Sequence, residues 1–283
     1  MDQVSKVIDY YNGTLVDYKY FWNTPNNKAM HYGYYDETIS NHDSAVLKMN
    51  EVVSKLGFVK KGDRVLDAGC GYGSSAQYLA KNMECRVTGL TIVPDQAKVA
   101  TLYANNAGIG DDVKFEVGDY AHTNYDDNTF DVYWGLESIC HALDKKLVIS
   151  EAYRLLIDGG RMIITDYMSR NNPLLTKKEQ LRIDVVLEGW EIPSLPSADW
   201  WVLSLTEAGF KTVEVNDLTL NVLRNKRYRL VFLPNSLAHF IAFILLKLKV
   251  ITFTRFKNVK AFIWHKRNLR DGLWQYKTVV ATK

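Results

Sequence analysis

A glycine-rich segment carries the most distinctive chemistry in the chain. It runs Asp67-Ala68-Gly69-Cys70-Gly71-Tyr72-Gly73 and follows the apolar residues Val65 and Leu66. Glycine is needed where a backbone turns sharply, adopts a positive φ and must let a ligand approach without a Cβ in the way. The segment therefore predicts a cofactor site between a strand and a helix that begins at Ser74.

Two classes of cofactor use such a turn. Gly71, Gly73 and Ala76 satisfy the GxGxxG/A pattern of a nicotinamide dinucleotide site. That site also needs an acid about twenty residues further on to hold the ribose, but the next strand ends Gly89-Leu90-Thr91. Asp67 would repel a pyrophosphate and attract a cofactor that carries an ammonium and a sulfonium. The sequence therefore favours S-adenosylmethionine.

The same region resembles a known family. DAGCGYG together with the stretch from Val87 to Gln96 is similar to class I methyltransferases, in the branch of sterol C-methyltransferases, tocopherol methyltransferases and cyclopropane fatty acid synthases. In that branch the ribose acid is replaced by a Gly-x-Thr-x-x-x-x-Gln pattern, which here is Gly89, Thr91 and Gln96. The resemblance implies that Leu90 and Thr91 border the adenosine and that the Gln96 amide binds the ribose hydroxyls.

Gly118-Asp119-Tyr120 follows the third expected strand. The resemblance implies that Asp119 accepts a hydrogen bond from the adenine amine and that Tyr120 covers the ring. Gly118 and Trp134 complete the expected cofactor-binding set, together with Asp67 and the glycines of the turn. A helix-capping Asp119 is the alternative.

Ionisable residues on the acceptor side lie between Trp134 and Lys145. This stretch is similar to the Glu-containing stretch of sterol methyltransferases and to the Glu-Ser, His and Asp-Lys stretch of tocopherol methyltransferases. One helical turn from Leu136 would place Glu137 and His141 on one face, above the strand ends. There they would remove a proton from a methylated carbon or hold an acceptor hydroxyl. A structural ion pair between them is the alternative.

An aromatic stretch from Met30 to Asp36 resembles the entry segment of tocopherol-type enzymes, where an N-terminal arm closes over the cofactor. The predicted acceptor-binding residues here are His31, Tyr32 and Tyr34, and Tyr35 is predicted to be catalytic because a π face stabilises a sulfonium or carbocation. Helical core packing is the alternative. Four tryptophans are candidates for the same wall: Trp22, Trp190, Trp200 and Trp201.

Short apolar runs alternate with amphipathic stretches, which predicts a parallel sheet wound by helices. The expected strands are 64–68, 86–90, 113–117, 132–135, 161–165, 211–216 and 275–281, and the expected helices are 74–81, 95–107, 145–155 and 200–208. Gly159-Gly160 is expected to be a turn before the fifth strand. The predicted fold is an α/β, Rossmann-like sheet of seven mostly parallel strands with helices on both faces.

The chain divides by charge. Residues 224–283 carry 14 Lys or Arg against one acid, whereas residues 1–223 carry 21 bases and 31 acids. We expect an N-terminal helical arm (1–56), a cofactor-binding core (57–217), a basic helical insertion that forms an acceptor lid (218–272) and a final strand (273–283).

Three scattered cysteines, with no CxxC or HExxH spacing, predict a reducing compartment and no metal site. No signal-like apolar run opens the chain, which predicts a cytoplasmic location.

The insertion contains an apolar run from Leu237 to Leu246, followed by Lys247 and Lys249. Ten residues are too few to span a bilayer, which needs about twenty. A packed lid and an interfacial helix at a membrane both remain open. The flanking cations would hold a diphosphate or anionic lipid headgroups, with an ordinary solvated surface as the alternative; they are Arg224, Lys226, Arg227, Arg229, Arg255, Lys257 and Lys260.

The leading interpretation is an S-adenosylmethionine-dependent methyltransferase acting on a small hydrophobic acceptor, in lipid or natural product biosynthesis. Tyr and Trp walls with a Glu/His pair favour C-methylation of an isoprenoid such as a prenyl diphosphate or sterol. O- or N-methylation of a small natural product and cyclopropane synthase-like lipid modification are alternatives. A homo-oligomer is compatible with the sequence, and a nucleic-acid-binding module is disfavoured because the cofactor motifs are retained.

Overall fold

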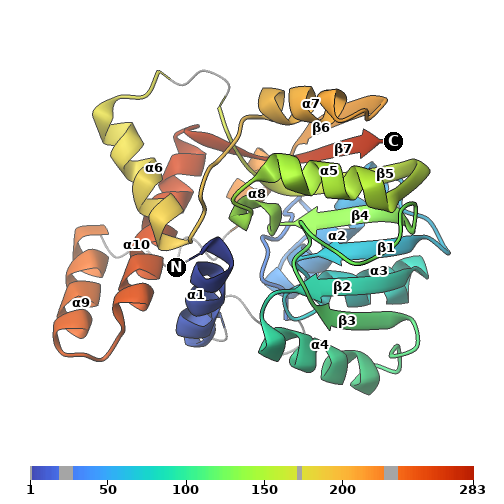
Figure 1. Cartoon of the computed structure of the whole chain (residues 1–283). Helices are drawn as coiled ribbons and strands as arrows, with labels where there is room; N and C mark the ends of the chain where they lie inside the picture. The colour runs from blue at the N-terminus through green and yellow to red at the C-terminus, as the bar shows by residue number, and fades with distance from the viewer. Residues whose placement is uncertain (1, 19–27, 171–173, 226–234) are drawn as a thin grey trace.

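The computed structural model describes residues 2–18, 28–170, 174–225 and 235–283. A seven-stranded sheet in the order β3-β2-β1-β4-β5-β7-β6 forms its centre (Figure 1). Strand β7 runs antiparallel to β5 and β6, whereas the other paired strands are parallel. The predicted fold class is confirmed. The strands are β1 Arg64–Ala68, β2 Arg86–Thr91, β3 Val113–Val117, β4 Phe130–Leu136, β5 Leu156–Ser169, β6 Thr212–Asp217 and β7 Trp274–Thr282.

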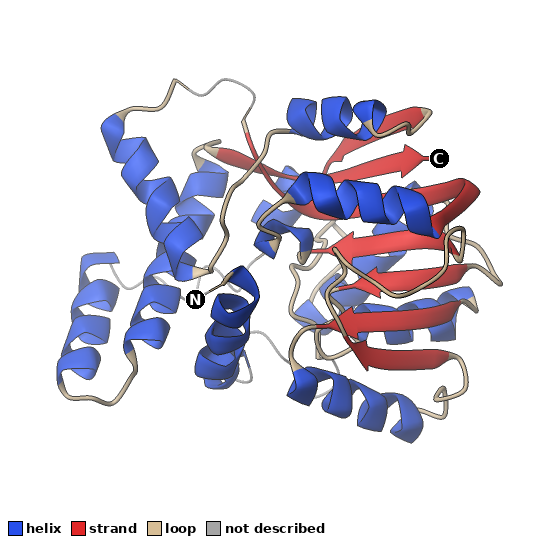
Figure 2. Cartoon of the chain, viewed as in Figure 1, coloured by secondary structure: helices blue, strands red, loops and turns tan. Residues whose placement is uncertain are grey.

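Helices cover both faces of the sheet (Figure 2). Successive strand residues point to opposite faces: Val65 packs in one core with α2 (His42–Leu56), α3 (Ser74–Met83) and α4 (Pro94–Asn106), and Leu66 packs in the other. The second core contains α5 (Lys145–Leu155) and α7 (Ala198–Glu207). Because both faces are covered, most residues of the central strands are apolar and buried.

A further group of helices lies beyond the carboxyl ends of the parallel strands (Figure 1). Helix α10 is tied to α6 by hydrogen bonds from Arg182 to Asn268 and Asp271, and to α1 by the ion pair of Arg255 with Asp17. A Cβ on Gly189 would lie 2.6 Å from Ala261 Cβ, so α6 and α10 are in close contact. These helices are α1 Gln3–Asp17, α6 Lys177–Gly189, α8 Thr219–Leu223, α9 Asn235–Lys247 and α10 Phe253–Arg270.

Two local predictions need correction. Gly159-Gly160 is not a turn before the fifth strand, because β5 already begins at Leu156 and its register with β4 shifts along this stretch. Helix α6 was not expected, since its apolar periodicity is weak. Its start could have been recognised from Thr176 and Glu179, which form a reciprocal capping box.

The predicted division of the chain stays a prediction, but contacts cross its boundaries. Helix α2, from the expected arm, packs on the sheet: a Cβ on Gly57, which follows it, would lie 2.1 Å from Ile163 Cδ1. Helix α6, from the expected core, packs against α10 of the expected insertion. Among the described residues, no helix has the length and apolar character needed to cross a membrane.

Candidate active site

The glycine turn after β1 adopts the backbone that its sequence predicts. Gly69, Gly71 and Gly73 have φ values of 87°, 53° and 78°, a region that disfavours other residues. A Cβ on Gly69 would lie 2.4 Å from Ser138 Cβ, and one on Gly73 would lie 2.5 Å from Phe115 Cζ. A Cβ on Gly71 would meet only Met30 Sδ, at 3.3 Å. Gly69 and Gly73 therefore permit close packing, whereas Gly71 borders open space.

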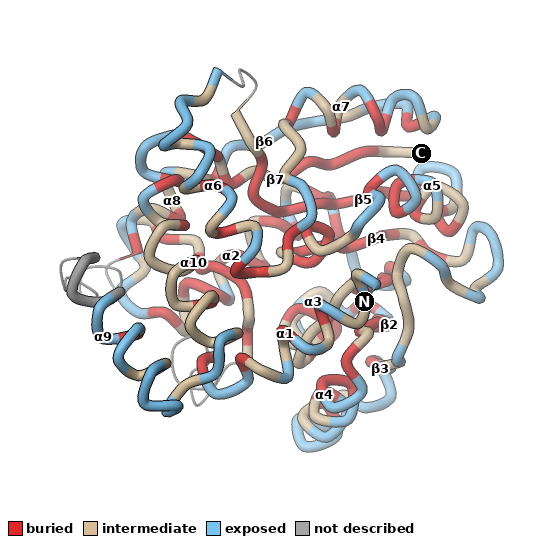
Figure 3. The backbone as a smooth tube through the Cα atoms, turned by 60° about the vertical axis from the view of Figure 1, so that its left-hand side comes forward, coloured by how far each residue is buried: buried red, intermediate tan, exposed pale blue. Residues whose placement is uncertain are grey.

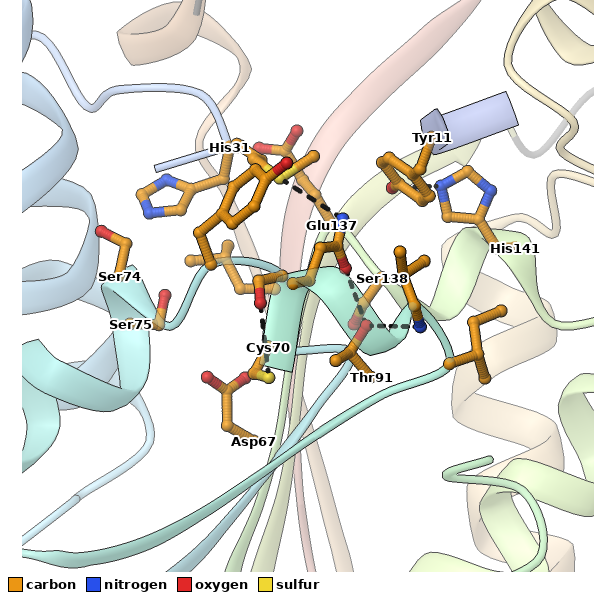
Figure 4. Close-up of a pocket in the computed structure, with 18 of the residues that line it drawn as sticks. Tyr11, His31, Asp67, Cys70, Ser74, Ser75, Thr91, Glu137, Ser138 and His141 are labelled. Carbon is orange, nitrogen blue, oxygen red and sulfur yellow. Dashed lines mark hydrogen bonds between the residues drawn. The ribbon is translucent and has the colours of Figure 1, made fainter. Parts of the chain in front are cut away.

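That space is a cavity above the carboxyl ends of β1, β2 and β4 (Figure 4). Its free volume is about 740 Å³, part of it open to solvent, which is within the usual range for small-molecule sites. Nine of the residues predicted from sequence line it: His31, Asp67, Gly69, Gly71, Thr91, Gln96, Tyr120, Glu137 and His141.

Asp67 places an unsatisfied carboxylate at the floor of this cavity. The side chain is 2% exposed, and its Oδ2 has no hydrogen-bond partner among the described residues. Burial raises the pKa of Asp67 to about 7, against a hydrogen bond from the Ala76 backbone that lowers it. A buried, unpaired carboxylate is costly, so a cationic group in the cavity would find its partner here.

Thr91 fixes the orientation of the Gln96 amide. Thr91 Oγ1 donates a 2.7 Å hydrogen bond to Gln96 Oε1 and accepts one from the Val93 backbone. The Gln96 Nε2 atom is left beside the cavity, 3.9 Å from Met30 Sδ. Because its oxygen is already used, the Gln96 amide presents donors, which suits the hydroxyls of a ribose.

Glu137 follows β4 in a left-handed conformation, with φ 51°. Its Oε1 accepts hydrogen bonds of 2.6 Å from the Tyr32 backbone and from the Tyr276 hydroxyl, and its Oε2 accepts one of 2.7 Å from the Tyr167 hydroxyl. Removal from water raises the pKa of Glu137 to about 8, although the two tyrosine hydrogen bonds oppose the shift. Glu137 is therefore a fixed carboxyl group with the basicity that a general base needs near neutral pH.

His141 lines the same cavity, but the expected single helical turn is wrong. Only residues Ile139–His141 form a 3₁₀ turn, because Glu137 donates its backbone N–H to Thr165 O at 2.8 Å and stays with the sheet. The described structure holds no hydrogen bond between Glu137 and His141. The His141 Nε2 atom lies 3.0 Å from the Tyr11 hydroxyl, and burial lowers the pKa of His141 to about 4, so its imidazole is neutral.

A second cavity of about 370 Å³ adjoins the first. The two share Tyr11, Met30, Glu137 and His141 as lining residues, so Glu137 stands at their junction. No Lys or Arg is among the described residues that line the second cavity. Its other lining residues are Tyr10, Tyr18, Cys140, Tyr167, Trp190 and Ile192.

Comparison with known proteins assigns the family. A family model described as a methyltransferase domain matches residues 66–164. The 27-O-demethylrifamycin SV methyltransferase of Amycolatopsis mediterranei (strain S699) is 32% identical over 190 residues, which cover 67% of this chain and 69% of that protein. The chain belongs to the S-adenosylmethionine-dependent methyltransferases. The predicted family and cofactor are thereby confirmed.

A C-methyltransferase is also among the proteins to which this methyltransferase is similar in sequence. Sterol 24-C-methyltransferase of Saccharomyces cerevisiae is 31% identical over 218 residues, and the chain spans about half the length of that relative, 54%. The fold is shared with geranyl diphosphate C-methyltransferase from Streptomyces coelicolor A3(2), solved with Mg²⁺, geranyl diphosphate and S-adenosyl-L-homocysteine. The TM-score is 0.75 at 19% identity, over 100% of this chain and 98% of that one.

The methyltransferase uses its N-terminal aromatic residues differently from the prediction. The Tyr35 hydroxyl bonds His42 Nδ1 at 2.8 Å, in the packing of α2, so Tyr35 does not line the described cavity, and its catalytic role stays a prediction. Tyr34 lies there too, with its backbone N–H bonded to Ala45 O. Tyr32 contributes its backbone to Glu137, while its ring packs edge-on against Tyr167. Tyr34 and Tyr35 pack against the core, but in a segment without helix, so the helical packing weighed as the alternative does not describe them.

Some predicted cofactor residues also lie away from the described cavity of the methyltransferase. Asp119 Oδ1 accepts a hydrogen bond from the Ala121 backbone at 2.9 Å in a turn, and no helix begins there, so Asp119 is not the helix cap weighed as its alternative. Leu90 and Trp134 are buried in the two cores, and Gly118 packs against Leu90. Leu90 and Trp134 belong to β2 and β4, and their side chains point into the two cores.

The tryptophans of the methyltransferase divide in the same way. Trp190 lines the second cavity, as predicted for the aromatic wall. Trp200 and Trp201 pack in the core under α7 instead. Trp22 lies outside the described residues. Tyr11, Tyr167 and Tyr276 are the site residues that sequence reasoning missed, because no local motif marks a tyrosine that reaches the site from a distant strand or helix.

Proposed function

We propose that this methyltransferase transfers a methyl group to a carbon atom of a small, hydrophobic, isoprenoid-type acceptor. The observation that carries the proposal is the position of Glu137, a carboxyl group with a raised pKa that borders both cavities. C-methylation of a double bond requires a base for the proton that carbon must lose, and O-methylation of an acidic hydroxyl requires no such base on carbon.

The first cavity fits S-adenosylmethionine. Asp67 would hold its ammonium, since Oδ2 is buried without a described partner. Gln96 would hold the ribose hydroxyls, and Gly71 leaves the backbone open to the ligand. When bound, the cofactor supplies an electrophilic methyl group that is attached to its sulfonium sulfur.

The second cavity fits the acceptor. Its tyrosine and tryptophan faces attract positive charge, so they would stabilise a carbocation and keep water from it. Two of the cations considered for a diphosphate already form ion pairs within the chain: Arg255 pairs with Asp17 and Lys257 pairs with Glu191. Lys226, Arg227 and Arg229 lie outside the described residues. The described lining therefore favours an uncharged reacting end, as in a sterol, over a diphosphate close to Glu137.

The proton balance assigns a task to Glu137. The electron pair of an acceptor double bond would form the new bond to the methyl carbon as the carbon–sulfur bond of the cofactor breaks and its electron pair stays on sulfur. This leaves a cation on the neighbouring acceptor carbon. A carbon next to the cation then gives its C–H electron pair to a new double bond, and the proton passes to the Glu137 carboxylate. Tyr167 and Tyr276 hold that carboxylate by their hydroxyls.

The sterol and geranyl diphosphate C-methyltransferases support this proposal by their named activities. O-methylation is the second candidate, since the named activity of the rifamycin relative is O-methylation. In that case Glu137 would accept a hydroxyl proton instead. The predicted cytoplasmic location and the predicted homo-oligomer stay predictions.

The test is an acceptor panel with methyl-labelled S-adenosylmethionine and the purified chain. The panel contains sterols, prenyl diphosphates, prenyl alcohols, and quinols or phenols. Label in an isoprenoid product that Glu137→Gln no longer forms would support the proposal. Label only in phenols or quinols would overturn it in favour of O-methylation.

A further inference from the structure

Part of helix α9 is exposed to solvent (Figure 3), and several of its exposed side chains are large and apolar. Helical spacing places these side chains on one side of the helix, whereas Ala242 on the other side is 4% exposed. A helix that faces water is normally polar on its outer side. The α9 apolar face consists of Phe240 (59% exposed), Ile241 (40%), Phe243 (47%) and Ile244 (39%) in the helix, with Leu248 (67%) in the turn that directly follows it.

The turn after α9 extends this surface. Val250 and Phe253 are each 61% exposed, and Val250 N–H bonds Leu245 O at 2.9 Å, which holds the turn against the helix end. Seven large apolar side chains are thus exposed within fourteen residues, 240–253. Clustering of this kind marks an interaction site, whereas singly scattered apolar side chains are ordinary.

The surroundings of this face are cationic. Residues 218–270 contain twelve Lys or Arg and no Asp or Glu. Lys247 lies over the Phe243 ring at 5.4 Å and Lys260 over the Phe256 ring at 5.6 Å, while Lys249 sits in the turn. Within the part of the chain that the structure describes, none of these three lysines has a carboxylate at ion-pair distance.

We propose that the α9 apolar face docks on an anionic lipid surface. Thirteen residues make a helix of about 20 Å, too short to span a bilayer and suited to lie in its interface. Lys247, Lys249 and Lys260 meet the negative headgroups. A second copy of the chain fits less well, because a two-fold contact would bring the same cations together with no acid between residues 218 and 270 to offset them.

Docking would also place the acceptor site near lipid. Arg255 on α10 forms hydrogen bonds of 2.9 and 2.7 Å with Asp17 at the end of α1. Helix α1 carries Tyr10 and Tyr11, which line the second cavity. The surface and the cavity are therefore joined through two helices, although the docking inference stands independently of the acceptor's identity.

Flotation of the full-length chain with vesicles tests the inference. We expect binding to phosphatidylcholine vesicles that contain phosphatidylserine, and much weaker binding to phosphatidylcholine alone. Phe240→Ser with Phe243→Ser should lower the partition coefficient by about tenfold or more. Lys247→Gln and Lys249→Gln should each lower it about fivefold, on the anionic vesicles only.

The matched control is Phe58→Ser with Leu102→Ser, which removes two apolar side chains of similar exposure, 64% and 56%, one just after α2 and one on α4, outside α9. This variant should float like the wild type. Absence of wild-type binding to anionic vesicles would overturn the inference, and so would an equal loss in the control.

Light scattering tests whether a second copy of the chain occupies the face instead. A wild-type dimer that dissociates in the variant Phe240→Ser with Phe243→Ser would identify a second copy as the occupant and would also overturn the inference. Methyl transfer measured without vesicles should be unchanged in all these variants. A failure of the docking inference can therefore be distinguished from a failure of the proposed activity.

Discussion

The Tyr276 hydroxyl donates a 2.6 Å hydrogen bond to Glu137 Oε1, although 139 residues separate the two in the chain. Antiparallel pairing of β5 with β7 explains the contact, because Tyr276 lies directly opposite Tyr167 in the register. Paired residues of an antiparallel ladder point to the same face, so both hydroxyls reach one carboxylate. The last strand of the sheet therefore fixes the proposed base.

Glu137→Gln should leave cofactor affinity nearly intact and lower turnover by roughly 10²-fold or more, the usual scale for a general acid or base. Glutamine keeps the size of the side chain but cannot accept the proton from carbon. Isothermal titration with S-adenosylhomocysteine and single-turnover kinetics measure the two effects. Wild-type turnover in this variant would leave Glu137 a purely structural role.

The rate should depend on pH through Glu137. Its pKa is about 8 in the free protein, and only the carboxylate accepts a proton. The value of kcat/KM should therefore rise about tenfold per pH unit below 8 and level off above it. The positive charge of the bound cofactor stabilises the Glu137 carboxylate and lowers its pKa. The kcat profile, which reports the bound complex, should therefore level off at a lower pH than the kcat/KM profile. A flat profile from pH 6 to 9 would contradict the assignment.

Tyr167→Phe and Tyr276→Phe should each move that profile to higher pH. Each hydroxyl bonds the Glu137 carboxylate and lowers its pKa, so its loss makes the carboxylate harder to form. Tyr35→Phe is the matched control, because it removes a buried tyrosine hydroxyl that bonds His42. An unshifted profile in both site variants would show that these hydroxyls do not act through Glu137.

Asp67 should couple cofactor binding to proton release. Its pKa is about 7 in the free protein, and a bound ammonium favours the charged form and lowers that pKa. Affinity should therefore increase with pH up to about 7 and then become constant. Titration calorimetry in two buffers of different ionisation enthalpy detects the released proton. Asp67→Asn should lose both the affinity and the release, and pH-independent binding by the wild type would refute the pairing.

Gly71→Val should abolish cofactor binding. Its φ of 53° disfavours a β-branched side chain, and the added atoms would project toward the cavity and Met30. Gly62→Val provides a comparison, since Gly62 also has a positive φ, 85°, but its added Cβ would touch nothing within 4 Å. Equilibrium dialysis with labelled cofactor should separate the two, and thermal unfolding shows whether each variant is folded.

Much of the sheet was predictable because each strand and crossover helix has a local pattern. The turn from Asp67 to Gly73 was predictable for the same reason, since its spacing is set by backbone geometry within a few residues. The resemblance identified Glu137 and His141 as candidate site residues. Their relative positions were not predicted, because the expected single helical turn from Leu136 does not form. The left-handed backbone at Glu137 depends on Thr165, a residue of the neighbouring strand.

The partners of Glu137 could not be read from the sequence. Tyr167 and Tyr276 look like ordinary strand residues, and only the register of β5 with β7 brings them together. Tyr35 stands in a suggestive motif, but its hydroxyl bonds His42, seven residues away on the next helix. Long-range strand pairing, which no local pattern encodes, decided the positions of Tyr167 and Tyr276.

The atom that receives the methyl group tests the central claim most directly. The protein is incubated with the isoprenoid that the panel selects and with ¹³C-methyl-labelled S-adenosylmethionine, and the product is analysed by NMR. We expect a labelled methyl group bonded to carbon, a product with a new or shifted double bond, and no such product from Glu137→Gln. A labelled methyl group on oxygen or nitrogen, formed at an undiminished rate by Glu137→Gln, would contradict the claim.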